Sequence, residues 1–174
     1  MAPIKSIEYF RVPPRWLFVK ITDENGNYGW GEATLESHTQ AVEGCLEFYK
    51  SEIENIWQTA WRKHFYCGGA VFMSALSGID TALWDMKGRK LGVPIYELLG
   101  GKVRDKIKVY AWIVRHLDQK ADDEERQQRL DAGFTCVKMN ATADLGWLDS
   151  PAALQTSVDR LETVKKMGLD VGAD

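Results

Sequence analysis

Apolar and polar residues alternate along the first part of the chain, and this pattern predicts a small antiparallel sheet. The alternation runs from Ile4 to Arg11, and further strand-like runs cover Trp16–Ile21 and Tyr28–Glu32. A period of two residues is typical of a half-buried strand. Asn25-Gly26 separates the second run from the third, and it can supply the positive φ angles of a hairpin turn. We therefore expect a three-stranded meander.

A helical period follows the meander. Residues 39–49 and 53–61 carry apolar side chains at steps of three and four residues, as amphipathic helices do. The strongest helical pattern begins after Gly69 and stops near Gly92, a residue that commonly ends helices. Its predicted buried stripe consists of Phe72, Ala75, Leu76, Ile79, Ala82, Leu83 and Met86.

Strands and helices alternate in the last part of the chain. We expect strands at Ile107–Ile113, at Thr135–Met139 and from Leu169 onward, with helices between them. The second of these helices has Ser150 as its cap and Pro151 at its first position. Its predicted apolar stripe consists of Leu154, Val158, Leu161 and Val164, whereas the helix before it has almost no stripe. The β-α-β-α-β order is typical of a parallel sheet with right-handed crossovers.

The two patterns predict two domains, with a boundary near residue 104. Residues 1–104 form an α+β unit. Residues 105–174 supply the first three strands of a doubly wound sheet or of a (β/α) barrel.

Composition excludes several classes of protein. The net charge is −3, from 22 basic and 25 acidic residues, whereas a nucleic-acid binder usually carries a basic excess. No stretch approaches the roughly 20 apolar residues of a membrane span, and no signal peptide is recognisable. Cys45, Cys67 and Cys136 are widely spaced and odd in number, which favours a reducing compartment. We expect a cytoplasmic protein without nucleic-acid or membrane partners.

The last residue carries the most informative carboxylate. Asp174 follows the third predicted strand of the parallel region, and chemistry in parallel α/β proteins is placed at the carboxyl ends of strands. A buried parallel strand needs neighbours on both sides, so we expect the sequence to be truncated within its second domain and inactive alone. Taken by itself, Asp174 is a metal ligand, a helix cap or a solvated chain end.

Two segments carry a resemblance to a known family. Ala75–Arg89, continued by Pro94-Ile95 and Leu98–Gly101, resembles the signature helix of the mandelate racemase and muconate lactonising group of the enolase superfamily. Tyr28–Glu32 resembles the G-x-G-E strand of the same group. The resemblance implies an α+β capping domain followed by a modified (β/α) barrel. Other segments are most similar to the sugar acid dehydratases of the group, namely Pro13–Trp16, Phe65–Gly69, Val137–Asn140 and Leu145-Gly146.

The resemblance also implies a chemistry. Loss of a proton next to a carboxylate produces an enediolate dianion, so a cation must neutralise the developing charge. Mg²⁺ prefers oxygen ligands, and by resemblance Asp174 is the first of three such ligands. A dehydratase then expels the β-hydroxyl group with the help of a general acid. We expect Mg²⁺-dependent dehydration of a sugar acid, by a protein that forms a homo-oligomer at full length.

Lys138 and Asn140 are the candidate catalytic residues of the second domain. They alternate along one predicted strand, so both side chains point to the same face. Racemase-like members have Lys-x-Lys here, and their second lysine is the base. Asn140 cannot abstract a proton, which argues against racemisation and favours hydrogen bonding by Asn140 and charge stabilisation by Lys138. The alternative is that Lys138 only extends to solvent at the barrel mouth. The resemblance also implies that the principal catalytic histidines of the family lie beyond Asp174.

The candidate substrate-binding residues belong to the first domain. Arg15, Trp16 and Tyr66 lie in two loops that, by resemblance, fold over the barrel mouth. These side chains offer hydrogen-bond donors and flat apolar faces, which a sugar acid requires, although ordinary loop packing is the favoured alternative for each residue taken singly. Two other functions stay open: a non-catalytic fragment that serves as an interaction module, and a different acid-sugar dehydratase or racemase of the superfamily.

Overall fold

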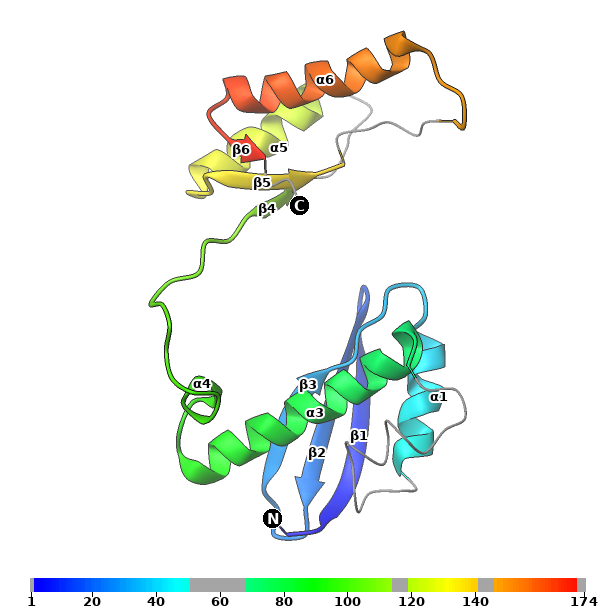
Figure 1. Ribbon diagram of the computed structural model, residues 1–174, viewed down its shortest axis with the longest axis vertical. Coiled ribbons are helices and arrows are strands. Elements are labelled where there is room, and N and C mark those ends of the chain that lie inside the picture. Colours follow the sequence, from blue (N-terminus) through cyan, green and yellow to red (C-terminus); the bar gives the residue numbers. More distant parts are fainter. Residues whose placement is uncertain (1, 51–67, 114–118, 141–145, 172–174) are drawn as a thin grey trace. The chain divides into compact units, whose positions relative to one another are not determined.

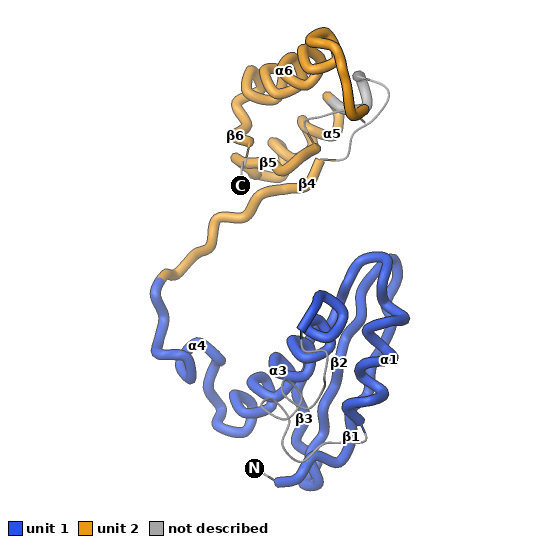
Figure 2. Tube along the Cα trace, turned by 45° about the vertical axis from the view of Figure 1, so that its right-hand side comes forward, with its two compact units in different colours: residues 1–103 blue, residues 104–174 orange. Residues whose placement is uncertain are grey.

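The computed structural model describes residues 2–50, 68–113, 119–140 and 146–171. The chain forms two compact units, Met1–Val103 and Arg104–Asp174 (Figure 2). No helix within these described ranges is long and apolar enough to cross a membrane.

The first unit is built on the predicted meander. Strands β1 (Ile4–Val12), β2 (Trp16–Asp23) and β3 (Tyr28–Glu32) form an antiparallel sheet in the order β1-β2-β3. Along β2, buried and half-buried residues alternate strictly, as the period of two predicts. The sheet therefore has one face for a core and one face open to solvent.

Two helices cover the core face of this sheet (Figure 1). Helix α1 spans Thr39–Lys50 and helix α3 spans Ala70–Leu91. Gly92 ends α3 in the left-handed conformation, with φ 68°, which glycine adopts without steric cost. The short helix α4 (Ile95–Leu98) follows. The core contains Leu17, Val19, Ile21, Val42, Leu46, Ala75, Ile79 and Ala82. The predicted helix at 53–61 lies outside the described residues.

Glycine allows α3 to contact β3 backbone to backbone. A Cβ on Gly29 would collide with the carbonyl oxygen of Ala82, and a Cβ on Gly31 would collide with the carbonyl oxygen of Gly78. A Cβ on Gly78 would in turn lie 2.7 Å from the Cβ of Ala33. The G-x-G-E strand and the signature helix therefore form one packing unit.

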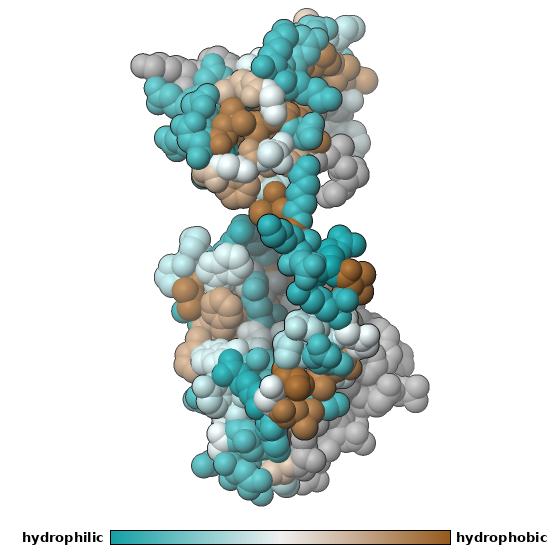
Figure 3. Space-filling model, turned by 90° about the vertical axis from the view of Figure 1, so that its left-hand side faces the viewer, coloured by the Kyte–Doolittle hydropathy of each residue, from teal (hydrophilic) through white to brown (hydrophobic). Residues whose placement is uncertain are grey.

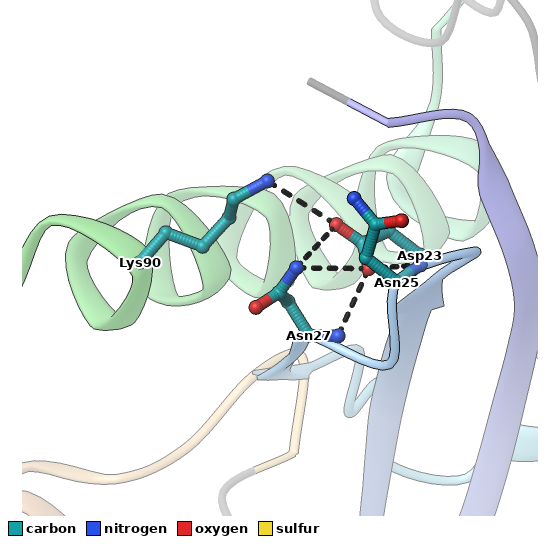
Figure 4. Close-up of polar contacts among 4 residues, drawn as sticks. All are labelled: Asp23, Asn25, Asn27 and Lys90. Carbon is teal, nitrogen blue, oxygen red and sulfur yellow. Dashed lines mark hydrogen bonds and ion pairs between the residues drawn. The ribbon is translucent and has the colours of Figure 1, made fainter.

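A buried carboxylate fixes the β2–β3 turn. Asp23 is fully buried, and its Oδ1 atom accepts hydrogen bonds from the backbone N–H groups of Asn25 and Asn27 at 3.0 and 2.9 Å (Figure 4). The Asn27 side chain also donates to it, and the Lys90 Nζ atom lies 3.3 Å from Oδ2. Burial acts to raise the pKa of Asp23, but the donors from Asn27 and Lys90 outweigh it, and the pKa lies below its usual value.

The second unit is a parallel sheet with two helices. Strands β4 (Ala111–Ile113), β5 (Cys136–Met139) and β6 (Asp170–Val171) pair in that order. Helices α5 (Gln119–Asp131) and α6 (Pro151–Lys166) connect them on one side of the sheet (Figures 1 and 2). The Ser150 side chain caps α6 by accepting from the Ala153 N–H group. The core consists of Ala111, Ile113, Val137, Val164 and Leu169.

Two predictions for this unit are wrong in detail. Of the expected strand at 107–113, only the last three residues pair, and Ile107 is 77% exposed. The apolar stripe of α6 is only partly buried: Val164 is buried, whereas Leu154 and Val158 are 51% and 46% exposed. The helix docks through the face that carries the small Ser157 and Val164. Hydrophobic periodicity identifies the side chains of a helix that can be buried. It does not show which face of the helix packs against the sheet.

Helix α5 docks despite its polar sequence. Leu130 and the adjacent Phe134 pack against the core of the second unit. Arg126 is fully buried and its Nη1 atom forms an ion pair with Asp123 at 2.8 Å. The aliphatic stem of a buried arginine can cover apolar surface, so a helix with few apolar residues can still present a buried face. Exposed apolar side chains nevertheless occur on both units as brown areas within a largely hydrophilic surface (Figure 3).

Candidate functional site

The first unit contains a pocket of about 680 Å³ at one end of its sheet. The turn between β1 and β2 forms one wall, and the segment between β3 and α1 forms the other. Two hydrogen bonds hold the walls together: the Ala33 N–H group donates to the Leu17 carbonyl at 2.8 Å, and the Leu17 N–H group donates to the Thr34 side-chain hydroxyl at 3.0 Å. The lining residues are Arg11, Val12, Pro13, Pro14, Arg15, Trp16, Glu36, Ser37, Thr39 and Gln40.

Two predicted substrate-binding residues lie together in this pocket. The guanidinium carbon of Arg15 lies 5.0 Å from the centre of the Trp16 ring, within the range of a cation–π contact. Trp16 in turn stacks against Phe18, with 6.3 Å between ring centres. The pocket thus combines a hydrogen-bonding cation with a flat aromatic face. The third predicted residue, Tyr66, lies outside the described residues.

Each arginine of the pocket is paired with a glutamate. Arg15 Nη1 forms an ion pair with Glu36 Oε1 across the two walls. Arg11 donates from Nε and Nη2 to both carboxylate oxygens of Glu43 in α1. The hydrogen bond from Arg11 lowers the pKa of Glu43 despite the opposing effect of burial. The guanidinium charges are therefore compensated before any ligand enters.

A tight turn sets the position of Glu36. His38 N–H donates to the Leu35 carbonyl at 3.1 Å, and Ser37 has a φ of 63°. A positive φ at the third residue is the requirement of a type II turn, and it is uncommon for a residue with a Cβ. The His38 carbonyl then accepts from the N–H groups of Ala41 and Val42, which starts α1. Glu36 is held at the second position of a turn anchored to a helix.

The sequence prediction missed Glu36 and Arg11 as pocket residues. A signal for Glu36 was present, because the start of β2 and the end of β3 must be adjacent in an antiparallel pair. Position 15 immediately precedes β2 and position 36 lies four residues after β3, so a pairing of their opposite charges could have been inferred from the sequence. For Arg11 the partner is 32 residues away on a helix, and strand periodicity alone does not indicate its direction.

The second unit positions Lys138 on the sheet face opposite its hydrophobic core. Val137 and Met139 pack into the core beneath the helices, so the alternation of β5 places Lys138 on the other face. Lys138 is half-buried and its Nζ atom lies 5.9 Å from the centre of the Tyr110 ring. In the parallel register it is paired with Trp112 of β4.

Asn140 lies one residue beyond the carboxyl end of β5. It is exposed, and its backbone carbonyl accepts a hydrogen bond from Arg160 Nη1 of α6 at 2.7 Å. This bond fixes the backbone where the chain leaves the strand. Lys138 and Asn140 thus belong to one strand end of the second unit, whereas Arg15 and Trp16 belong to the pocket of the first unit.

The predicted metal ligand, Asp174, lies outside the described residues. Within the described part of the chain, no three His, Cys, Asp or Glu side chains come together in a way that could hold a metal ion. What the described residues do provide is the parallel order β4-β5-β6, whose carboxyl ends lie at one edge of the sheet.

Comparison with known families decides the relationship of the chain. Residues 10–100 match the family described as "Mandelate racemase / muconate lactonizing enzyme, N-terminal domain". The chain belongs to the mandelate racemase and muconate lactonizing enzyme family. The matched region includes the whole pocket, so the pocket lies in the N-terminal capping domain of this family.

Curated relatives of the family give a closer comparison. The chain is 44% identical over 171 residues to a D-galactonate dehydratase from Verminephrobacter eiseniae, an alignment that covers 93% of this chain and 44% of the relative. It spans about half the length of the curated relatives that it matches.

Solved structures of the enolase superfamily agree with this relationship. A protein from Zymomonas mobilis that is provisionally assigned as a dehydratase has a TM-score of 0.87 at 27% identity, over 97% of this chain and 53% of that one. An enolase from Pantoea ananatis, with bound D-gluconate and magnesium, has a TM-score of 0.72 at 25% identity, over 97% of this chain and 52% of that one.

Proposed function

We propose that the chain supplies the capping domain and the first barrel strands of a sugar acid dehydratase, which converts D-galactonate into 2-keto-3-deoxygalactonate. The observation that carries this proposal is the 44% identity to a relative named D-galactonate dehydratase, over 93% of the chain. The pocket of the first unit supports it, since Arg15 and Trp16 are suited to a polyhydroxylated ligand.

The reaction begins at the carbon next to the carboxylate. Removal of its proton generates an enediolate, and loss of the β-hydroxyl group as water gives the enol of the 2-keto-3-deoxy acid. Lys138 lies on the open face of β5 near its carboxyl end, and the role that we assign to its ammonium group is to stabilise the developing negative charge. Asn140 contributes hydrogen bonding and no base, because an amide does not take up a proton at neutral pH.

Mg²⁺ is the cofactor that fits this proposal. When bound, it neutralises the charge of the enediolate. Its support is the Pantoea ananatis relative, which binds magnesium together with D-gluconate. Asp174 is the residue of this chain that we propose as a ligand, and its carboxylate is of the oxygen type that Mg²⁺ prefers.

A chimera tests the proposed reaction. The chain would replace the segment that it matches in the Verminephrobacter eiseniae relative, and the product would be assayed with D-galactonate with and without Mg²⁺. We expect release of a 2-keto-3-deoxy acid that requires the metal. The relative itself is the positive control, and circular dichroism establishes that the chimera is folded. A folded chimera that turns over no D-galactonate contradicts the proposal.

The same assay separates the other reactions of the superfamily. A panel of sugar acids that differ in configuration at C2 and C4 would show whether another acid-sugar dehydratase is the better description. In deuterated water, exchange of the α-proton without loss of water would indicate racemisation. We expect water loss, because Asn140 replaces the second lysine of the racemase pattern.

A further inference from the structure

An apolar stripe of α6 lies outside the core of the second unit. Leu154 and Val158 are half exposed, and they share one line of the helix with Leu161, at steps of four and three residues. This line is roughly a quarter of a turn away from Ser157 and Val164, which are buried. Helix α6 thus carries a second apolar line, which the described residues of the unit leave largely open.

A groove lies beside this stripe, with a volume of about 610 Å³. Its lining residues are Val158, Leu161, Glu162, Lys165, Lys166 and Val171. The accessible walls are almost entirely apolar, because lysine and glutamate line a groove with their aliphatic stems and keep their charged ends in water. The groove therefore suits an apolar side chain better than a charged one.

Two apolar side chains protrude near the N-terminal end of the same helix. Trp147 and Leu148 are 104% and 98% exposed, in the segment that leads into α6 (Figure 1). The Asp149 carboxylate accepts a hydrogen bond from the Gly146 N–H group, which closes a turn around them. Tryptophan is enriched at protein–protein interfaces, so this turn presents the kind of side chain that the groove accepts.

We propose that α6 is the interface of a homodimer, in which two copies of the helix pack antiparallel and Trp147 and Leu148 of each copy enter the groove of the other. The occupant of the groove is thus a second copy of this chain. The interface is separate from the capping-domain pocket and from the sheet face that carries Lys138.

The spacing along the helix fits a two-fold axis midway between Leu154 and Val158, so that each of these residues lies opposite the other in the second copy. A rise of 1.5 Å per residue puts Lys165 about 14 Å beyond this axis and Ser150 about 9 Å before it. Trp147 lies three residues further out than Ser150, so it falls opposite the Lys165 end of the partner's groove. A two-fold contact is made twice and closes the dimer.

The charges favour this orientation of the two helices. Asp149 lies next to the protruding Trp147, and Lys165 lies at the groove. In the antiparallel arrangement the carboxylate of one copy meets the ammonium group of the other at both ends of the interface. In a parallel arrangement each charge would meet its own copy. Charge complementarity of this kind determines orientation and register, and antiparallel helix dipoles add to the preference.

The available area predicts a weak dimer. Trp147 alone offers about 150–250 Å² of surface. With Leu148, Leu154 and Val158 added, each copy contributes about 500 Å², and the pair buries about 1,000 Å², the lower end of specific interfaces. We therefore expect a reversible dimer that forms at micromolar concentrations.

Sedimentation equilibrium of the 174-residue chain, from about 1 to about 200 µM, tests the proposal. We expect a monomer–dimer equilibrium, and Trp147→Ser should raise its dissociation constant at least about tenfold, as loss of a central aromatic side chain does. Val158→Glu places two like charges beside the two-fold axis and should abolish the dimer. Lys165→Glu should weaken it less at high salt than at low salt, whereas a parallel dimer would be unaffected by this exchange of one like-charge pair for another.

Two control variants match these changes. Thr156→Glu adds the same charge to an exposed position on the opposite side of α6, and Leu99→Ser removes an exposed apolar side chain from the first unit. Both should leave the dissociation constant unchanged, and circular dichroism establishes that every variant is folded. A chain that stays monomeric at about 200 µM overturns the proposal and assigns the α6 face to a different partner. Equal weakening by Val158→Glu and Thr156→Glu overturns it as well. Because mass is measured, the outcome is independent of whether the chimera dehydrates D-galactonate.

Discussion

Gly31 of β3 lies against the backbone carbonyl of Gly78 in α3, and no Cβ fits between them. The strand and the helix are brought together without any intervening side chain. Because the same strand ends at the segment that carries Glu36, this contact also determines where the second wall of the pocket begins.

The close contact predicts a large effect for the smallest possible substitution. Gly31→Ala is expected to destabilise the first unit by about 3 kcal/mol, since overpacking typically costs about 1–3 kcal/mol and here the obstructing atom is backbone. Urea denaturation followed by tryptophan fluorescence measures it. Gly44→Ala in α1 is the control, because an added Cβ there meets nothing within 4 Å and alanine favours helices by about 0.5–1 kcal/mol. Equal stability of the two variants would contradict the packing described here.

Removal of the Asp85 side chain is expected to destabilise strand β3 locally. Its Oδ2 atom accepts from the Trp30 backbone N–H at 2.9 Å and from Arg89 Nε at 2.8 Å. Trp30 belongs to an edge strand, so this N–H group has a side-chain partner in place of another strand. Asp85→Ala is expected to destabilise the unit by about 1 kcal/mol. Hydrogen exchange should accelerate at the Trp30 amide more than at Val19, a residue of the central strand; uniform acceleration would indicate a global effect instead.

Local patterns predicted the elements of the first unit well because each of these elements carries a strong signal in its own sequence. The meander at residues 4–32 and the helix at 70–91 follow from alternation, a turn dipeptide and a glycine stop. The second unit was predicted less well. The pairing of residues 107–110 and the docked face of α6 depend on surfaces that are distant along the chain. For the site, sequence types indicated Arg15 and Trp16, but the compensating Glu36 required knowledge of which loops meet.

The environment of Asp23 predicts a pH dependence of stability. Its pKa in the folded chain is lower than the ordinary 3.8, so the unfolded chain binds more protons between the two values, and stability rises with pH there. The contribution is complete above the ordinary value and is lost as the pH falls through the folded value. Unfolding free energies measured from pH 7 down to pH 2.5 should decline less steeply at the acidic end for Asp23→Asn. Glu24→Gln is the control, and an unaltered slope in Asp23→Asn would contradict the assignment.

Replacement of Lys138 is expected to lower the catalytic rate without lowering the stability of the fold. In the chimera, Lys138→Met keeps most of the aliphatic length but removes the ammonium group. Loss of one group that stabilises a developing negative charge costs about 10²–10³ in kcat, and we expect a decrease of that order with D-galactonate. Lys166→Met is the matched control, since Lys166 lies on the exposed surface of α6, where it pairs with Glu162 at 3.2 Å. If both variants retain full kcat, Lys138 only extends to solvent. If Lys138→Met lowers kcat while the unfolding midpoint stays unchanged, the lysine acts on the reacting charge.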